Sequence, residues 1–269
     1  MRQWRLIRHQ ASDGAYNMAV DEAILQQVSA GDAPPTLRLY AWQPLCLSLG
    51  YGQRLRDVDQ QALQRRGWGL VRRPTGGKAI LHGDELTYSI ALPRDHELAA
   101  GDVVASYRRI SRALMHALQQ LGLTPQSEQQ AKGNRGLGPV CFEVPSHYEI
   151  TAAGKKLMGS AQVRRRMGLL QHGTLPLYGD ITRICDALAY NDETERQTAR
   201  AQVAERATTL ASVLTAVPTW TTVADAIVTG FRETFDITFV TDDLTVAEAQ
   251  RADELIETQF AHPDWTAKR

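Results

Sequence analysis

Two groups of short strand-like segments joined by turns place the strongest constraint on how this chain of 269 residues can fold. The first group covers residues 69–73, 78–82 and 86–92, and the second covers 148–151, 156–165 and 169–177. Each segment has the length of a strand, and glycine lies in every connection between one segment and the next. The chain is therefore predicted to build much of its sheet from strands that follow one another closely.

Helix-like spacing of apolar residues occurs before, between and after these groups. Predicted helices cover residues 13–28, 57–66, 103–121, 183–188, 208–214, 223–235 and 246–260, and Asp57 is the expected N-cap of the second. Further strands are predicted at 4–7, 36–42, 45–49 and 237–240, with 36–42 and 45–49 paired around Pro44. The polar segment 191–197 is the best candidate for a linker. Strands that alternate irregularly with helices predict an α+β fold, not a doubly wound sheet.

The composition argues against several classes of protein. Thirty basic residues balance thirty acidic ones, which does not favour general affinity for nucleic acid. No run approaches the length of a membrane-spanning segment, and the N-terminal residues lack the apolar core and cleavage site of a secretory signal. Three cysteines do not make a disulfide framework, and no two of them have metal-ligand spacing. We therefore expect a cytoplasmic globular protein without a metal site.

Cys141 is the cysteine whose surroundings least favour burial. It lies in a run with glycine and proline on both sides and no apolar periodicity, which predicts an exposed or cleft-lining loop. Cys46 and Cys185 instead lie in apolar segments and fit the role of small buried side chains. Cys141 is thus a candidate nucleophile, with an incidental loop thiol as the alternative.

Two further stretches combine glycine with basic residues. In residues 72–82 (RRPTGGKAILH), adjacent glycines permit close backbone approach to a ligand, but the stretch lacks the features of a P-loop or a dinucleotide fingerprint. In residues 154–162 (GKKLMGSAQ), a lysine at the head of a strand precedes small residues that leave room for an elongated apolar ligand. Taken alone, each stretch is also compatible with an ordinary hairpin turn that carries solvated charges.

These two stretches, followed by Gln171-His172-Gly173, occur in the order found in the biotin/lipoate protein ligase superfamily, which the chain resembles. The resemblance covers residues 1 to about 240. Within the superfamily the chain is most similar to the cysteine-dependent octanoyltransferases of bacterial lipoate biosynthesis, because residues 141–149 match the motif whose thiol becomes acylated. The resemblance implies a mixed sheet with flanking helices. It also implies a catalytic domain over residues 1–240 and a helical extension, residues 241–269, packed on it.

The resemblance assigns roles to individual residues. Cys141 would carry the acyl group, and Lys156 would hydrogen-bond the acyl carbonyl, whereas Lys155 would point to the opposite face of its strand. The residues expected to bind substrate are Arg73, Gly76, Gly77, His82, Gly159, Ser160 and Ala161. The candidates for a general base are His82, His147 and His172, and the basic clusters at 72–73 and 164–166 are candidate contacts for acidic partner proteins.

The implied reaction moves an octanoyl group from octanoyl-acyl carrier protein to a lysine of a lipoyl domain, such as glycine cleavage H protein. It requires no cofactor and no metal, and we expect no nucleic-acid or membrane partner. The first alternative is an ATP-dependent lipoate–protein ligase on the same fold, in which Cys141 would be dispensable. The second is a non-catalytic binder of lipoyl domains or acyl groups. The presence of both Cys141 and Lys156 argues against this alternative, because a binder needs neither residue.

Overall fold

A mixed sheet of eight strands forms the centre of the computed structural model, which describes residues 2–128 and 149–268. The strand order is β11-β1-β2-β6-β10-β9-β8-β7. Strand β1 pairs in parallel with β11 and β2, and the other neighbours are antiparallel. The strands are β1 Arg2–Arg8, β2 Thr36–Tyr40, β6 Glu85–Pro93, β7 Gln126–Glu128, β8 Glu149–Ala152, β9 Lys155–Arg164, β10 Gly168–Pro176 and β11 Ile237–Thr241.

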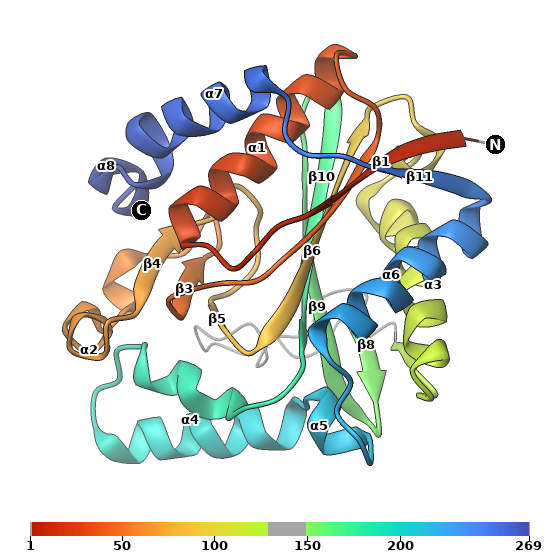
Figure 1. Ribbon diagram of the computed structural model, residues 1–269. Coiled ribbons are helices and arrows are strands. Elements are labelled where there is room, and N and C mark those ends of the chain that lie inside the picture. Colours follow the sequence, from red (N-terminus) through yellow and green to blue (C-terminus); the bar gives the residue numbers. More distant parts are fainter. Residues whose placement is uncertain (1, 129–148, 269) are drawn as a thin grey trace.

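A second, three-stranded sheet lies beside the large one (Figure 1). Its order is β4-β3-β5, with bounds β3 Cys46–Leu49, β4 Gly69–Arg72 and β5 Ile80–His82. The predicted pairing of residues 36–42 with 45–49 around Pro44 is therefore wrong, because the two strands belong to different sheets. After Tyr40 the backbone turns toward Ser12, whose carbonyl accepts the N–H of Gln43 at 3.0 Å. This detour carries the chain from one sheet to the other.

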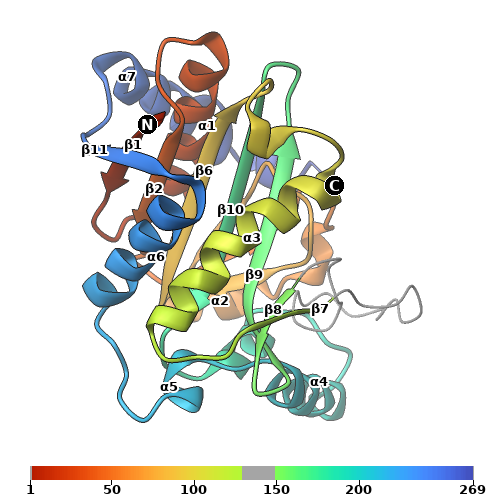
Figure 2. The same cartoon turned by 90° about the vertical axis from the view of Figure 1, so that its right-hand side faces the viewer.

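Helices cover both faces of the large sheet, and the α+β class is confirmed (Figures 1 and 2). Helices α1 and α7 lie on one face, where their apolar residues form one core, and α3 and α6 lie on the other face over a second core. No helix among the described residues is long and apolar enough to cross a bilayer. The helices are α1 Gly14–Ala30, α2 Gln60–Arg66, α3 Val103–Gln120, α4 Glu193–Arg206, α5 Leu210–Val213, α6 Trp220–Phe235, α7 Val246–Leu255 and α8 Pro263–Thr266.

Shorter helical turns connect these elements. Short 3-10 segments cover Leu55–Asp57, Glu97–Ala99 and Ile181–Asp186, and a π-helical turn, Ile256–Phe260, extends α7. The predicted N-cap Asp57 is wrong, because α2 begins later and Asp59 caps it: its Oδ1 accepts the N–H of Ala62 at 2.8 Å. Asp57 instead belongs to the 3-10 turn before that cap.

The segment 191–197 is not a linker, since α4 begins at Glu193. Asp192 caps this helix by accepting the N–H of Glu195 at 2.8 Å. Within the first turn Arg196 donates to Glu193 at 2.7 Å, and such pairs stabilise a helix whose face is solvated. The polar composition therefore marks an exposed helix rather than a flexible connection.

The C-terminal segment packs on the rest of the chain through α7 and α8. Leu255 and Phe260 join the core beneath α1. The indole N–H of Trp265 donates to the backbone carbonyl of Arg72 at 2.8 Å, and the Arg72 guanidinium donates to the carbonyl of Thr266 at 2.7 Å. These contacts attach α8 to β4. The domain boundary at residue 240 stays a prediction, and β11 crosses that position.

Candidate functional site

A cavity between the large and the small sheet collects residues from both predicted motifs. Arg73 and Gly77 come from the glycine turn, His82 comes from β5, and residues 159–161 come from β9. The remaining expected residue, Gly76, lies in the exposed turn beside them, where its carbonyl accepts from Arg73 at 2.8 Å. The other lining residues are Met18, Tyr40, Trp42, Ser48, Ile80, Thr87, His172, Gly173 and Thr174.

Arg73 holds the glycine turn in place from inside the protein. Its guanidinium is buried and donates to the carbonyls of Gly76 and Lys78 at 2.8 Å and of Ser48 at 3.0 Å. The turn passes so close to Gly50 that a β-carbon there would lie 1.9 Å from the carbonyl oxygen of Gly77. Glycine is therefore required at position 50 for the turn to sit where it does.

Burial also corrects one prediction about partner proteins. Arg72 and Arg73 are 0% and 3% exposed, so they are not part of a docking surface. The guanidinium of Arg164 is likewise engaged within the protein. Its Nη1 donates to the carbonyl of Gly101 at 2.6 Å, and its Nη2 donates to the carbonyl of Asp102 at 2.7 Å, just before α3. Within the cluster 164–166, Arg165 and Arg166 remain exposed.

His82 is fixed by contacts on both ring nitrogens. Its Nδ1 lies 2.6 Å from the Oε1 of Glu85, and its Nε2 lies 2.8 Å from the Oγ of Ser48. The ring stacks on Trp42 with centroids 3.9 Å apart and planes 10° from parallel. The imidazole therefore forms a rigid wall of the cavity.

His172 is held in the same way from the opposite wall. Its Nε2 lies 2.7 Å from the hydroxyl of Thr75, and its Nδ1 lies 3.3 Å from the carboxylate of Asp21. Burial lowers the pKa of His172 below its ordinary value, although the Asp21 carboxylate opposes this. Burial acts to raise the pKa of Asp21, but the charge of Arg38 and the hydrogen bond from His172 outweigh it and leave that pKa lowered.

The contacts of these two rings bear on the search for a general base. Each ring has both nitrogens engaged by protein groups, so neither His82 nor His172 has a nitrogen free to accept a thiol proton in this arrangement. His147 lies outside the described residues. The structure therefore gives no support to a histidine base among the residues that it describes.

Lys156 is buried, and its ammonium is paired with a carboxylate. Its Nζ lies 2.5 Å from the Oε1 of Glu149, and both side chains are less than 10% exposed. A β-carbon at Gly159 would lie 3.7 Å from this Nζ, which places the ammonium beside the cavity wall. Lys155 differs as expected for alternate residues of a strand: its Nζ is near the surface and donates to the carbonyl of Ala204 at 2.7 Å.

The three cysteines are placed as follows. Cys141 lies outside the described residues, in the segment that joins β7 to β8 and ends directly before Glu149. Cys46 and Cys185 are buried, as predicted. Burial raises the pKa of the Cys46 thiol well above its ordinary value, so this thiol is a poor nucleophile. Among the described residues no group of three His, Cys, Asp or Glu side chains could hold a metal ion.

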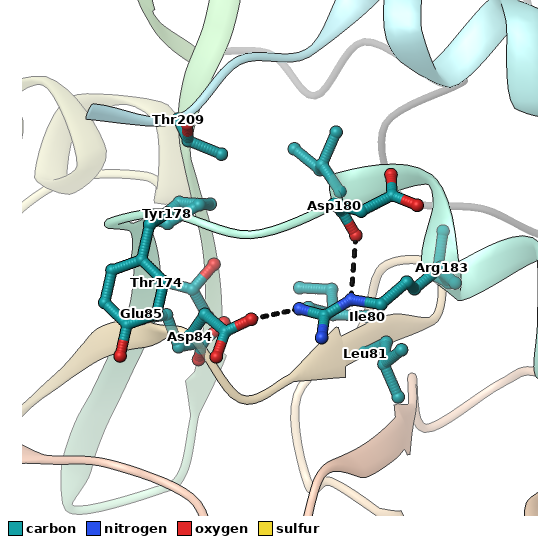
Figure 3. A pocket seen from close by; sticks show the side chains of 12 residues that line it. Ile80, Leu81, Asp84, Glu85, Thr174, Tyr178, Asp180, Arg183 and Thr209 are labelled. Carbon is teal, nitrogen blue, oxygen red and sulfur yellow. Dashed lines mark hydrogen bonds and ion pairs between the residues drawn. The ribbon is translucent and has the colours of Figure 1, made fainter. Parts of the chain in front are cut away.

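A second pocket adjoins the cavity and shares Ile80 and Thr174 with it (Figure 3). Arg183 crosses this pocket, where it pairs with the carboxylate of Asp84 and donates to the carbonyl of Asp180 at 3.0 Å. The pocket is therefore more polar than the cavity, whose wall is built largely from aromatic, aliphatic and glycine residues.

Several residues of the site were missed from the sequence. Asp21 is a charged residue inside the apolar run of α1, and that position is a signal that could have marked it. Glu149 and Thr174 each lie at the edge of a motif already quoted, but nothing in the local pattern assigns them a partner. Their importance depends on pairing between strands, which the sequence does not display.

Residues 13–232 match the family described as the lipoyl protein ligase A/B catalytic domain. A protein named Octanoyltransferase LipM from Brevibacillus brevis is 37% identical and covers 100% of both chains. The protein of the same name from Moorella thermoacetica is 40% identical, over 99% of this chain and 98% of its own.

Two ligase structures are similar over nearly their whole length. One is the bipartite lipoate protein ligase of the archaeon Thermoplasma acidophilum, studied with its E2 lipoyl domain. It has a TM-score of 0.84 and 25% identity, and covers 99% of this chain and 97% of that one. The other is a lipoate-protein ligase A bound with ATP, with a TM-score of 0.82, 25% identity and 99% of each chain covered.

Proposed function

The chain belongs to the lipoyl protein ligase A/B catalytic domain family and is an octanoyltransferase, for which we propose the donor, the acceptor and the catalytic residues. The donor is octanoyl-acyl carrier protein, and the acceptor is a lysine of a lipoyl domain, such as that of the glycine cleavage H protein. The observation that carries the catalytic assignment is the ammonium of Lys156, buried at the wall of the cavity that gathers both glycine-rich motifs.

In the first step the thiolate of Cys141 attacks the carbonyl carbon of the donor thioester. A new carbon–sulfur bond forms, and the carbonyl electron pair moves onto the oxygen. Lys156 donates a hydrogen bond to this oxygen, which stabilises the charge that develops there. Collapse of the intermediate breaks the bond to the carrier's sulfur and leaves the octanoyl group on Cys141.

In the second step the neutral amine of the acceptor lysine attacks the new thioester. The same carbonyl oxygen becomes negative again at the same place, so one set of donors serves both steps. Collapse expels the Cys141 thiolate, and the nitrogen loses a proton to solvent water to give the amide. Two steps allow two protein substrates to use one site in turn.

The acyl chain occupies the cavity between the two sheets. Gly159 and Gly173 are lining residues without side chains, and Met18, Trp42 and Ile80 supply apolar surface. Gly173 cannot be replaced by a larger residue without disturbance, because a β-carbon there would lie 2.6 Å from the carbonyl of Gly159 and 2.7 Å from the ring of Tyr88. An elongated apolar group suits a passage of this kind.

Intact-mass measurement of the purified chain mixed with octanoyl-acyl carrier protein tests the proposal. We expect the mass to increase by one octanoyl group in the absence of ATP, and the adduct to disappear when a lipoyl domain is added. An ATP-dependent ligase would require ATP and free acid instead. A non-catalytic binder would gain no covalent adduct under either condition, and either result would contradict the proposal.

A further inference from the structure

Thr174 carries a buried hydroxyl with no hydrogen-bond partner in the part of the chain that the structure describes. The residue is 2% exposed, and it lines both the acyl cavity and the adjoining pocket, where Figure 3 shows it among the labelled side chains. A buried hydroxyl without a partner destabilises a fold, and nearly all such groups in proteins are satisfied. Because Thr174 lines the cavity, a polar atom of a bound ligand could supply the partner that the protein does not.

The sheet register places this hydroxyl near Lys156. Thr174 on β10 lies directly opposite Gly159 on β9, so the two residues face the same side, with β-carbon positions about 4.5–5.5 Å apart. A β-carbon at Gly159 would lie 3.7 Å from the Nζ of Lys156. The hydroxyl and the ammonium therefore belong to the same end of the cavity.

Thr87 on β6 lies opposite Thr174 on the other side of β10, and its hydroxyl is fully hydrogen-bonded within the protein. Its Oγ1 accepts the indole N–H of Trp42 at 2.8 Å and donates to the carboxylate of Glu85 at 2.6 Å. Both its functions as acceptor and donor are used by the protein. The hydroxyl of Thr174 differs in that its donor function is available to a ligand.

We infer that Thr174 donates a hydrogen bond to the acyl carbonyl oxygen and acts beside Lys156 as a second donor to the oxyanion, an inference that rests on the proposed function. Thr174 keeps its proton throughout: when sulfur bonds to the carbonyl carbon, the electron pair moves to the oxygen and the hydrogen bond strengthens. When the intermediate collapses, the leaving thiolate departs with its electron pair and the hydrogen bond weakens. The residue thus touches the reacting group without transferring a proton.

Three variants test this inference. Thr174→Val removes the hydroxyl and keeps the shape, and Thr174→Ser restores a hydroxyl. Ser29→Ala is the matched control, because the hydroxyl of Ser29 is also buried without a partner among the described residues but lies against Gly168, at the start of β10. The measurement is the single-turnover rate of octanoyl adduct formation at saturating octanoyl-acyl carrier protein, together with the melting temperature.

We expect Thr174→Val to slow acylation by about 10²-fold, the usual cost of one oxyanion donor, with an unchanged or raised melting temperature. Thr174→Ser should remain within about threefold of the parent chain, and Ser29→Ala should not change the rate. A parent-like rate for Thr174→Val, or equal losses for the valine and serine variants, would overturn the inference while leaving the proposed function intact. Failure of the parent chain to gain an octanoyl group would overturn both.

Discussion

The ammonium nitrogen of Lys156 lies 2.5 Å from a carboxylate oxygen of Glu149, and both side chains are buried. Lys156 lies on β9 and Glu149 begins β8, so the pair connects neighbouring strands. Removing an ionised group from water is costly, and a close opposite charge offsets much of that cost. The pair therefore keeps a charged donor at the cavity wall, next to the end of the segment that carries Cys141.

The first prediction concerns the two adjacent lysines. Lys156→Ala should slow acyl-enzyme formation by about 10²–10³-fold, because the reaction loses a donor to the developing oxyanion. Lys155→Ala is the matched control and should have little effect, since this side chain lies near the surface and contacts the carbonyl of Ala204. Single-turnover kinetics followed by intact mass provide the measurement. Equal losses in the two variants would remove the single-lysine assignment.

The second prediction concerns Glu149 as a positioning residue. Glu149→Gln removes the carboxylate that pairs with the Lys156 ammonium and holds it at the cavity wall. The rate of acylation at saturating donor should fall by about tenfold, because the donor to the oxyanion is no longer held in place, and Glu149→Asp should restore part of the rate. The exposed Glu257→Gln serves as the control. A parent-like rate in Glu149→Gln, or a further loss when Glu149→Gln is added to Lys156→Ala, would show that the carboxylate does not act through Lys156.

The third prediction concerns the nucleophile. Cys141→Ser should abolish octanoyl transfer, because an alcohol without a dedicated base is a much weaker nucleophile than a thiolate. Cys46→Ser and Cys185→Ser should retain the chemistry and lower only the melting temperature, since both thiols are buried among apolar residues. Turnover with octanoyl-acyl carrier protein and a lipoyl domain is the assay. Near-normal turnover of Cys141→Ser would favour the ATP-dependent reaction.

The fourth prediction concerns stability in acid. Because burial lowers the pKa of His172 in the folded chain, the unfolded chain takes up a proton near pH 6.5 that the folded chain resists. The free energy of unfolding should therefore fall as the pH decreases below about 6.5, by at most about 1.4 kcal/mol per pH unit for one proton. The lowered pKa of Asp21 acts in the same direction, below about pH 4.

Urea unfolding at several pH values between 7 and 5 measures this dependence. His172→Gln should reduce the slope, because its side chain does not titrate. Part of the slope should persist, since burial also lowers the pKa of His9 and His96. A slope as steep in His172→Gln as in the parent chain would show that the acid sensitivity has another source.

Much of the local structure could be read from the sequence. Helices α1, α3 and α6 and strands β8, β9 and β10 lie close to their predicted positions, because each follows from the period of its own apolar residues and from glycine at its turns. Helix α4 is the exception, since its polar sequence has no apolar period that would predict it. Most of the residues predicted to bind substrate line one cavity, and their role in binding stays a prediction that rests on the resemblance of their motifs to a known family. Neither inference needed contacts between distant segments.

The tertiary structure alone decided how these pieces meet. It separated residues 36–42 and 45–49 into two sheets and thereby opened the cavity between them. It also brought Glu149 to Lys156 and Asp21 to His172. It left the hydroxyl of Thr174 without a hydrogen-bond partner among the described residues. Periodicity indicates which face of an element is buried, whereas strand register and the burial of single polar atoms depend on how separate elements pack against one another.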